Sequence, residues 1–181
     1  MSSPNPVLAA IRSRRVARAL TGEPVERAAL EEILRAARFA PNAGNRHLQH
    51  FVIVQDPAML RVLRMVSPGM LQRPPAVIAI CVDWERAEAF GLPPANRGAW
   101  IDVGTAAQTM LLAAHALGVA SGPVTSFSRA AVARVLNLPA RWSAELLVCL
   151  GHAAEGGPPP MRRGVTADWR HLTHWERFPQ R

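Results

Sequence analysis

The sequence contains no lysine, so its 21 basic residues are all arginines, and they outnumber its 13 acidic residues. The net charge of +8 would attract an anionic cofactor, nucleic acid or a membrane face. Only two cysteines are present, Cys81 and Cys149, and each lies in an apolar, strand-like run where a buried, inert thiol is expected. They match no zinc or redox spacing, which favours a reduced, cytoplasmic setting.

Three further signals are absent. The N-terminal residues Met-Ser-Ser-Pro-Asn-Pro contain no apolar signal core, and we expect no export. No glycine-rich dinucleotide fingerprint follows a predicted strand, which argues against a Rossmann dehydrogenase. Two histidine pairs, His47 with His50 and His171 with His174, have no cysteine or carboxylate at the spacing of a zinc site. No metal site is therefore predicted.

The composition fits one globular domain. A chain of 181 residues can bury roughly 70% of its unfolded surface.

The apolar run from Val103 to Ser128 carries no acidic side chain and no arginine, but Gly104, Gln108 and His115 argue against a membrane span. A helix that is apolar on most of its circumference must be buried, and in a chain this short a second copy is the expected partner.

Periodicity and breakers predict a mixture of helices and strands. Helices are expected at residues 6–20, 25–39, 56–67, 104–117 and 129–136, and strands at residues 50–55, 76–82, 120–124 and 145–150. Residues 83–96 contain a glycine and two prolines and are predicted to form a mobile loop across a site. The pattern does not decide whether neighbouring strands run parallel or antiparallel.

Two short stretches carry the functional signal. The first is residues 12–18 (RSRRVAR), whose guanidinium groups suit a phosphate. The second is residues 40–46 (APNAGNR), where a proline, a glycine and two asparagines cannot continue a helix. The amides and free N–H groups of this loop can meet the edge of a planar polar ligand. A segment that can bind a phosphate, followed by an amide-rich loop, suits a phosphorylated flavin.

These stretches resemble two signatures of the nitroreductase family of FMN-dependent oxidoreductases. Residues 11–20 are similar to its Arg-Arg-Ser-x-Arg run, and residues 40–51 to its Pro-Ser-x-x-Asn-x-Gln-Pro-Trp loop. The similarity continues through the apolar helix at 104–117, the turn at 122–127 (GPVTSF) and the arginine-rich tail that ends in WERF at 175–178. The sequence departs from the family pattern at Val16, at Asn42 and at residues 47–49, where His-Leu-Gln replaces Gln-Pro-Trp.

The resemblance implies an α+β fold of three layers, with helices flanking a central, mainly antiparallel sheet. It also implies an intertwined homodimer with FMN at the subunit interface. Residues 1–181 would form a single FMN-binding, nitroreductase-like domain. Within it, residues 153–181 would be a C-terminal arm that docks on the partner subunit and adds a strand to its sheet.

The same resemblance implies the phosphate contacts. Arg14, Arg15 and Arg18 would bind the phosphate and pyrimidine side of FMN, and Arg162 and Arg163 of the tail would close on the phosphate. Because the flavin N5 itself accepts and donates the hydride, no side chain is required to be catalytic.

Contacts to the flavin ring come from three other places. Pro41, Asn42, Ala43 and Asn45 would line the ring from the partner subunit, and Val124, Thr125 and Ser126 would lie along its N5 side. Ser67 stands where some members have a ring-contacting asparagine. Val16 replaces a serine, and because valine cannot donate a hydrogen bond, FMN affinity would fall while binding persists. His47 would be either a proton relay at the flavin edge or a solvated loop histidine.

The expected activity is that of an FMN-dependent oxidoreductase. It would pass a hydride from NAD(P)H to FMN and then reduce a nitroaromatic, a quinone or another electrophilic small molecule. A second hypothesis is that of an oxidase. The chain also resembles the catalytic subunit of cyclodipeptide oxidases, at residues 67–71, 81–83, 111–115 and 122–127. Those FMN enzymes desaturate a peptide-derived ring with oxygen and need a small partner protein.

A third reading is a flavin- or nucleic-acid-binding module without turnover. Arg162, Arg163 and Arg170 beside Trp169 and Trp175 would then form a cationic, stacking arm for single strands. No RNA-binding motif accompanies them, and aromatic residues make up only 6% of the chain. Nucleic acid is therefore not the expected partner.

Overall fold

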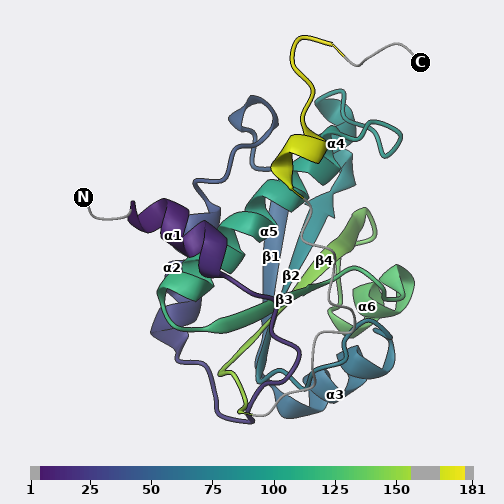
Figure 1. The fold of residues 1–181 in the computed structure, drawn as a ribbon. Coiled ribbons are helices and arrows are strands. Elements are labelled where there is room, and N and C mark those ends of the chain that lie inside the picture. Colours follow the sequence, from purple (N-terminus) through teal and green to yellow (C-terminus); the bar gives the residue numbers. More distant parts are fainter. Residues whose placement is uncertain (1–4, 156–167, 178–181) are drawn as a thin grey trace.

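The computed structural model describes residues 5–155 and 168–177, which form one antiparallel sheet with helices on both faces (Figure 1). The strands are β1 (Gln49–Val54), β2 (Ala76–Asp83), β3 (Ala120–Val124) and β4 (Trp142–Gly151). Their order in the sheet is β1-β2-β4-β3, and all three neighbouring pairs are antiparallel. The predicted α+β fold with a mainly antiparallel sheet is confirmed.

The sheet separates two apolar layers. On one face it packs against α2 (Arg27–Ala37) and α5 (Gly98–Ala116), and on the other against α3 (Pro57–Met65) and α6 (Arg129–Val135). Successive side chains of β2 point to opposite faces, so Ile80 joins the first layer and Cys81 the second. Because both faces are covered, every residue of β2 is buried, which explains its apolar sequence from Ala76 to Val82.

The first helix is shorter than predicted. In α1 (Pro6–Ser13), the Asn5 side chain accepts hydrogen bonds from two N–H groups of the first turn. The helix ends at Ser13, and the chain then runs along the outer edge of β3, where Val16 forms a parallel bridge with Ser121. The prediction of a helix to residue 20 was wrong, because pairing with a distant strand replaced the local helical hydrogen bonds.

The segment after β2 is also more regular than predicted. Residues 83–96 were expected to form a loop, but they begin with a short helix, α4 (Trp84–Ala89). The Asp83 carboxylate accepts a hydrogen bond from the Arg86 N–H at 3.1 Å, which caps this helix. Trp84 and Ala87 are buried against the core, so the helix is held by packing.

α5 is the longest helix of the described residues, and it includes Asp102 at its N-terminal end. One face, with Ala106, Met110 and Ala114, is buried against the sheet. Ile101 and Leu117 remain exposed, at 64% and 46%. No helix of the described residues has the length and apolar character needed to cross a membrane.

The two outer strands differ in what covers their free edges. The free edge of β3 is covered by residues 16 and 17, since the Ala17 N–H donates to the Ser121 carbonyl at 2.9 Å. β1 pairs only with β2 within the described part of the chain.

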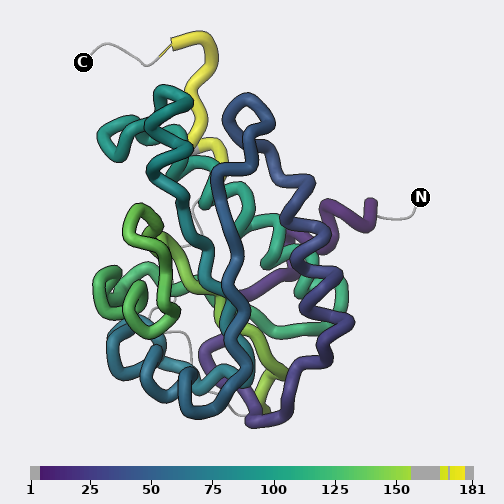
Figure 2. The backbone as a smooth tube through the Cα atoms, turned by 180° about the vertical axis from the view of Figure 1, so that it is seen from behind, coloured from purple at the N-terminus to yellow at the C-terminus, as the bar shows by residue number. Residues whose placement is uncertain are grey.

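The 3₁₀ turn η2 (Trp169–Leu172) lies at one end of the molecule, away from α1 in both views (Figures 1 and 2).

Candidate functional site

The arginine segment, residues 14–18, is fixed by the edge of β3, where Gly122 lets the two backbones approach closely. A Cβ atom on Gly122 would lie 2.9 Å from the carbonyl oxygen of Ala17 and 3.1 Å from Nε2 of Gln72. Such distances are too short for an alanine to fit without a shift. Glycine at this position therefore brings the arginine segment and the buried Gln72 side chain onto one surface.

The arginines of this segment are not equivalent. Arg14 is half-buried, and its Nη1 is enclosed but has no hydrogen-bond partner among the described residues. One guanidinium nitrogen of Arg15 donates to the carbonyls of Arg12 and Arg14, at 2.6 and 3.0 Å. Arg18 is exposed, and the Val16 side chain is 40% exposed. Arg14 thus holds the donor that most needs an anionic acceptor.

A tight turn brings Ser67 to the C-terminal end of β3. The Gly69 N–H donates to the Ser126 carbonyl at 2.9 Å, and a Cβ on Gly69 would lie 2.9 Å from the Ser126 Cβ. Ser67 is 1% exposed, and its hydroxyl oxygen has no hydrogen-bond partner in the described part of the chain. Val124 is buried, while Thr125 and Ser126 are exposed.

These contacts join three of the predicted stretches into one surface, which we call the β3 cluster. It comprises residues 14–18, 67–72 and 121–126. Sequence reasoning missed Gln72, which is 6% exposed and whose Nε2 lies beside Gly122. A single glutamine before two prolines gives no periodic or motif signal that would have identified it.

Residues 41–45 of the second predicted stretch form a loop that is anchored on α5. The Ala43 N–H donates to the Asp102 carboxylate, with both oxygens at 3.0 Å, and the Thr105 hydroxyl donates to the Pro41 carbonyl at 2.7 Å. Asp102 is only 5% exposed. Burial raises the pKa of its carboxyl, and the hydrogen bond from Ala43 offsets part of that rise. Neither Asp102 nor Thr105 was predicted, because each acts on residues about sixty positions away.

The backbone of this loop takes an unusual course. Gly44, Asn45 and His47 have positive φ angles of 57°, 54° and 49°. The Asn42 side chain closes the turn, because its Oδ1 accepts a hydrogen bond from the His47 N–H at 3.1 Å. Asn45 and His47 are exposed, so the loop presents its amide and imidazole groups outward.

The loop and the β3 cluster lie at opposite ends of α5 within one chain. Asp102 holds the loop near the start of the helix, whereas Nε2 of His115 in its last turn lies 2.8 Å from the Ser13 hydroxyl, directly before the arginine segment. At 1.5 Å per residue, the thirteen-residue separation places the two anchors about 20 Å apart. The structure therefore holds the two predicted stretches at separate places and does not bring them together in one chain.

The sequence model of the nitroreductase family matches residues 11–73 and 62–152. The chain belongs to the nitroreductase family. Both predicted stretches, residues 12–18 and 40–46, lie inside the matched part.

Individual proteins are similar to this one over most of the chain. It is 31% identical to an NADH dehydrogenase of Thermus thermophilus, over 87% of this chain and 92% of that protein. It is 27% identical to the FMN reductase [NAD(P)H] of Bacillus subtilis, over 66% of this chain and 54% of that protein. The structure of an FMN-dependent nitroreductase from Clostridium difficile superposes with a TM-score of 0.77 at 22% identity, over 94% and 99% of the two chains. At that identity the last likeness shows a shared fold.

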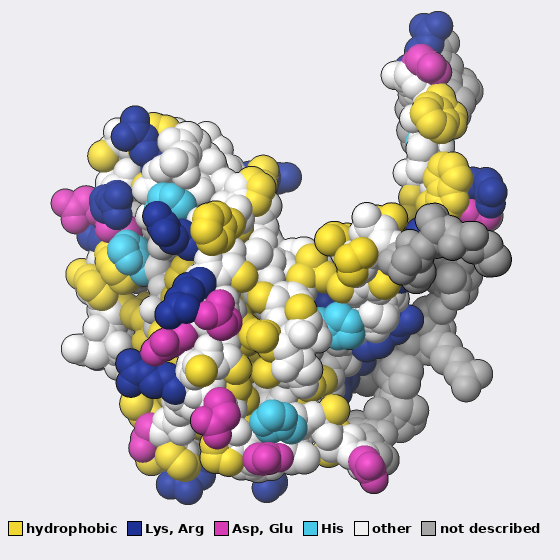
Figure 3. All heavy atoms as spheres, turned by 90° about the vertical axis from the view of Figure 1, so that its left-hand side faces the viewer, with side chains coloured by type: hydrophobic (Ala, Val, Ile, Leu, Met, Phe, Trp, Pro, Cys, Tyr) yellow, Lys and Arg dark blue, Asp and Glu magenta, His cyan; other side chains and the backbone are white. Residues whose placement is uncertain are grey.

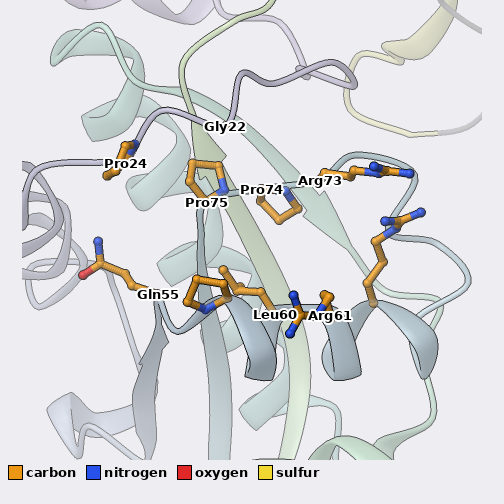
Figure 4. A pocket seen from close by; sticks show the side chains of 10 residues that line it. Gly22, Pro24, Gln55, Leu60, Arg61, Arg73, Pro74 and Pro75 are labelled. Carbon is orange, nitrogen blue, oxygen red and sulfur yellow. The ribbon is translucent and has the colours of Figure 1, made fainter.

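One pocket of this nitroreductase-family chain lies elsewhere. It has a volume of about 560 Å³ and lies between α3 and the start of β2, lined by Leu60, Arg61, Arg73 and four prolines among others (Figure 4). None of the predicted flavin contacts lines it. A site shared between two chains need not form a closed pocket in one, so the chemistry of the β3 cluster identifies the candidate site better than cavity size.

Two of the predicted residues, Arg162 and Arg163, lie outside the described residues. Among the residues that are described, no three histidine, cysteine, aspartate or glutamate side chains gather in a way that could hold a metal ion. His50, of the first histidine pair, instead stacks on Trp142 with ring centroids 3.9 Å apart, and burial lowers its pKa.

Proposed function

We propose that the chain is an FMN-dependent oxidoreductase that takes a hydride from NAD(P)H and reduces an electrophilic small molecule such as a nitroaromatic or a quinone. The observation that carries the proposal is the β3 cluster, where Arg14 and Ser67 both hold enclosed polar atoms without partners in the described part of the chain. Each stands at a position where the family resemblance predicts an FMN contact. The activities named for the Thermus thermophilus and Bacillus subtilis relatives support the same reaction class.

The residues present fit the cofactor. An enclosed guanidinium nitrogen without a carboxylate partner suits an anionic acceptor such as a phosphate, and a buried hydroxyl suits a polar ring atom. When bound, FMN accepts a hydride at N5 and passes reducing equivalents to the second substrate. The turn at residues 124–126 would place a backbone N–H beside N5, and Arg14 would stabilise the negative charge of the cofactor. The loop at residues 41–45 would cover the ring and keep it oriented.

We infer that this loop comes from a second copy of the chain. The separation of about 20 Å along α5 means that one chain supplies only part of a site at each end of the helix. Apolar side chains of α1 and α5 are exposed and would be covered in a homodimer: Val7 is 62% exposed, Leu8 49%, Ile11 49% and Ile101 64%. In such a dimer the loop of one copy would meet the β3 cluster of the other.

We also propose that residues 153–181 form an arm that docks on the partner subunit. Ala153, at its start, forms a bridge with Leu20. Farther along, Trp169, Leu172 and Trp175 are 57%, 73% and 75% exposed, and Figure 3 shows this part of the arm standing clear of the body. The free edge of β1 would receive the added strand, because the edge of β3 is already covered.

The absorption spectrum of the purified protein tests the proposal directly. It should show a flavin that bleaches when NADH or NADPH is added without oxygen, and reoxidises when a quinone or a nitroaromatic follows. If the bound flavin does not bleach with NADH or NADPH, and the protein instead consumes oxygen when a cyclic dipeptide is added, the oxidase alternative replaces the reductase. Protein that binds no added FMN would refute both. Light scattering on the same sample should give the mass of a dimer.

A further inference from the structure

Asp102 is a buried carboxylate without a cationic partner. It is 5% exposed, and no ion pair of the described residues includes it. Its carboxylate accepts a hydrogen bond from the Ala43 N–H, with both oxygens at 3.0 Å. Burying a charge in this way opposes folding unless the interaction it makes is strong. The interaction that the buried carboxylate makes is thus with the backbone of the loop at residues 41–45, not with a charged group of the core.

A second contact from the same helix fixes the loop one residue earlier. The Thr105 hydroxyl donates to the Pro41 carbonyl at 2.7 Å and lies 2.9 Å from the Asp102 carbonyl. Asn42 is therefore held on both sides, and its own Oδ1 accepts from the His47 N–H. The residues that follow have positive φ angles, a conformation that glycine adopts freely and that asparagine and histidine adopt more readily than most other residues. The contacts from Asp102 and Thr105 fix the chain directly before them.

We propose that Asp102 is a positioning residue that shapes the loop at residues 41–45 for flavin binding, by accepting the hydrogen bond from the Ala43 N–H. The inference rests on the proposed function, because it assumes that the loop contacts FMN. Asp102 itself does not touch the flavin; it acts through Ala43. The helix that faces the proposed partner therefore also sets the shape of the loop offered to that partner.

Three variants test this role through FMN affinity, followed by the quenching of flavin fluorescence. Asp102→Ala removes the acceptor and should weaken FMN binding about 10- to 100-fold, the range expected for one hydrogen bond to a charged group. Asp102→Asn keeps the size of the side chain and one acceptor oxygen, and should bind FMN with an affinity within a few-fold of the wild type. Thr105→Val is nearly isosteric and removes only the donor to Pro41, so it should weaken binding several-fold.

Asp56→Ala is the matched control. The Asp56 carboxylate also accepts a hydrogen bond from a backbone N–H, that of Met59 at 2.7 Å, but it caps α3 away from the loop. This variant should lower the melting temperature of the apoprotein because α3 loses its cap, yet leave FMN affinity unchanged. The comparison separates a loss of loop shape from a general loss of stability.

The outcomes distinguish this inference from the proposed function. If the wild type binds no FMN, the proposed function fails and the inference fails with it. If the wild type binds FMN and Asp102→Ala binds it equally well, only the positioning role is refuted. Equal weakening by Asp56→Ala, or no rescue by Asp102→Asn, would refute it too. Should Asp102→Ala not fold, Thr105→Val decides, and unchanged affinity in that variant overturns the proposal.

Discussion

Replacing Gly122 with alanine tests whether the β3 cluster is held together by backbone proximity. The added Cβ would lie 2.9 Å from the Ala17 carbonyl oxygen and 3.1 Å from Nε2 of Gln72. The glutamine side chain can rotate away, but the carbonyl belongs to a segment whose N–H already bonds to Ser121 at 2.9 Å. The arginine segment must therefore move away from β3.

Overpacking of this kind costs about 1–3 kcal/mol. In a chain of this length, 1 kcal/mol shifts the melting temperature by about 2–4 °C, so Gly122→Ala should melt about 2–12 °C below the wild type. FMN affinity should fall as well, because Arg14 would lose its position. Differential scanning fluorimetry of the apoprotein and titration with FMN measure the two effects separately.

Gly22→Ala serves as the control for this prediction. No atom lies within 4 Å of a Cβ at Gly22, and its φ is not positive. This variant should be as stable as the wild type or slightly more stable, since alanine restricts the unfolded chain. If Gly122→Ala melts with the wild type and binds FMN equally well, the close approach does not hold the arginine segment.

Three further predictions concern other buried groups. Burial raises the pKa of the Cys81 and Cys149 thiols to about 12, so an aromatic disulfide reagent at pH 8 should label neither in the native protein and both in denaturant. Arg129→Ala leaves the buried Glu145 carboxylate without the guanidinium 2.9 Å away, and should lower the free energy of unfolding by about 1–3 kcal/mol in urea titrations. Because the folded-state pKa of Asp102 is raised above its ordinary 3.8, the wild type should lose stability relative to Asp102→Asn as the pH rises above that value, and the two urea midpoints should converge below it.

The sequence predicted the strands well, because burial on both faces leaves a strong local pattern. The predicted strands at residues 76–82 and 145–150 are apolar throughout apart from Glu145, and both became central strands, β2 and β4, within a few residues of the expected bounds. The direction of the strands had no such local signal. It followed from the family resemblance, and the antiparallel pairing confirms it.

The elements that sequence reasoning missed depend on distant partners. Helix α1 stops at Ser13 because the next residues pair with β3, more than one hundred positions later in the chain. Asp102 belongs to no motif and precedes the predicted helix at residues 104–117, and only the folded chain shows that Ala43 donates to it. Contacts of this range leave no mark in local periodicity, so the sequence offers two candidate stretches but not the distant contacts that hold them in place.

The placement of the two halves at opposite ends of α5 has a genetic consequence under the proposed pairing of two copies. A variant damaged only in the arginine segment and a variant damaged only in the loop would each form inactive homodimers. In the mixed dimer, one site would combine both defects, while the other would be built from an intact cluster and an intact loop. Two inactive alleles expressed together should therefore restore activity, whereas two alleles damaged in the same half should not.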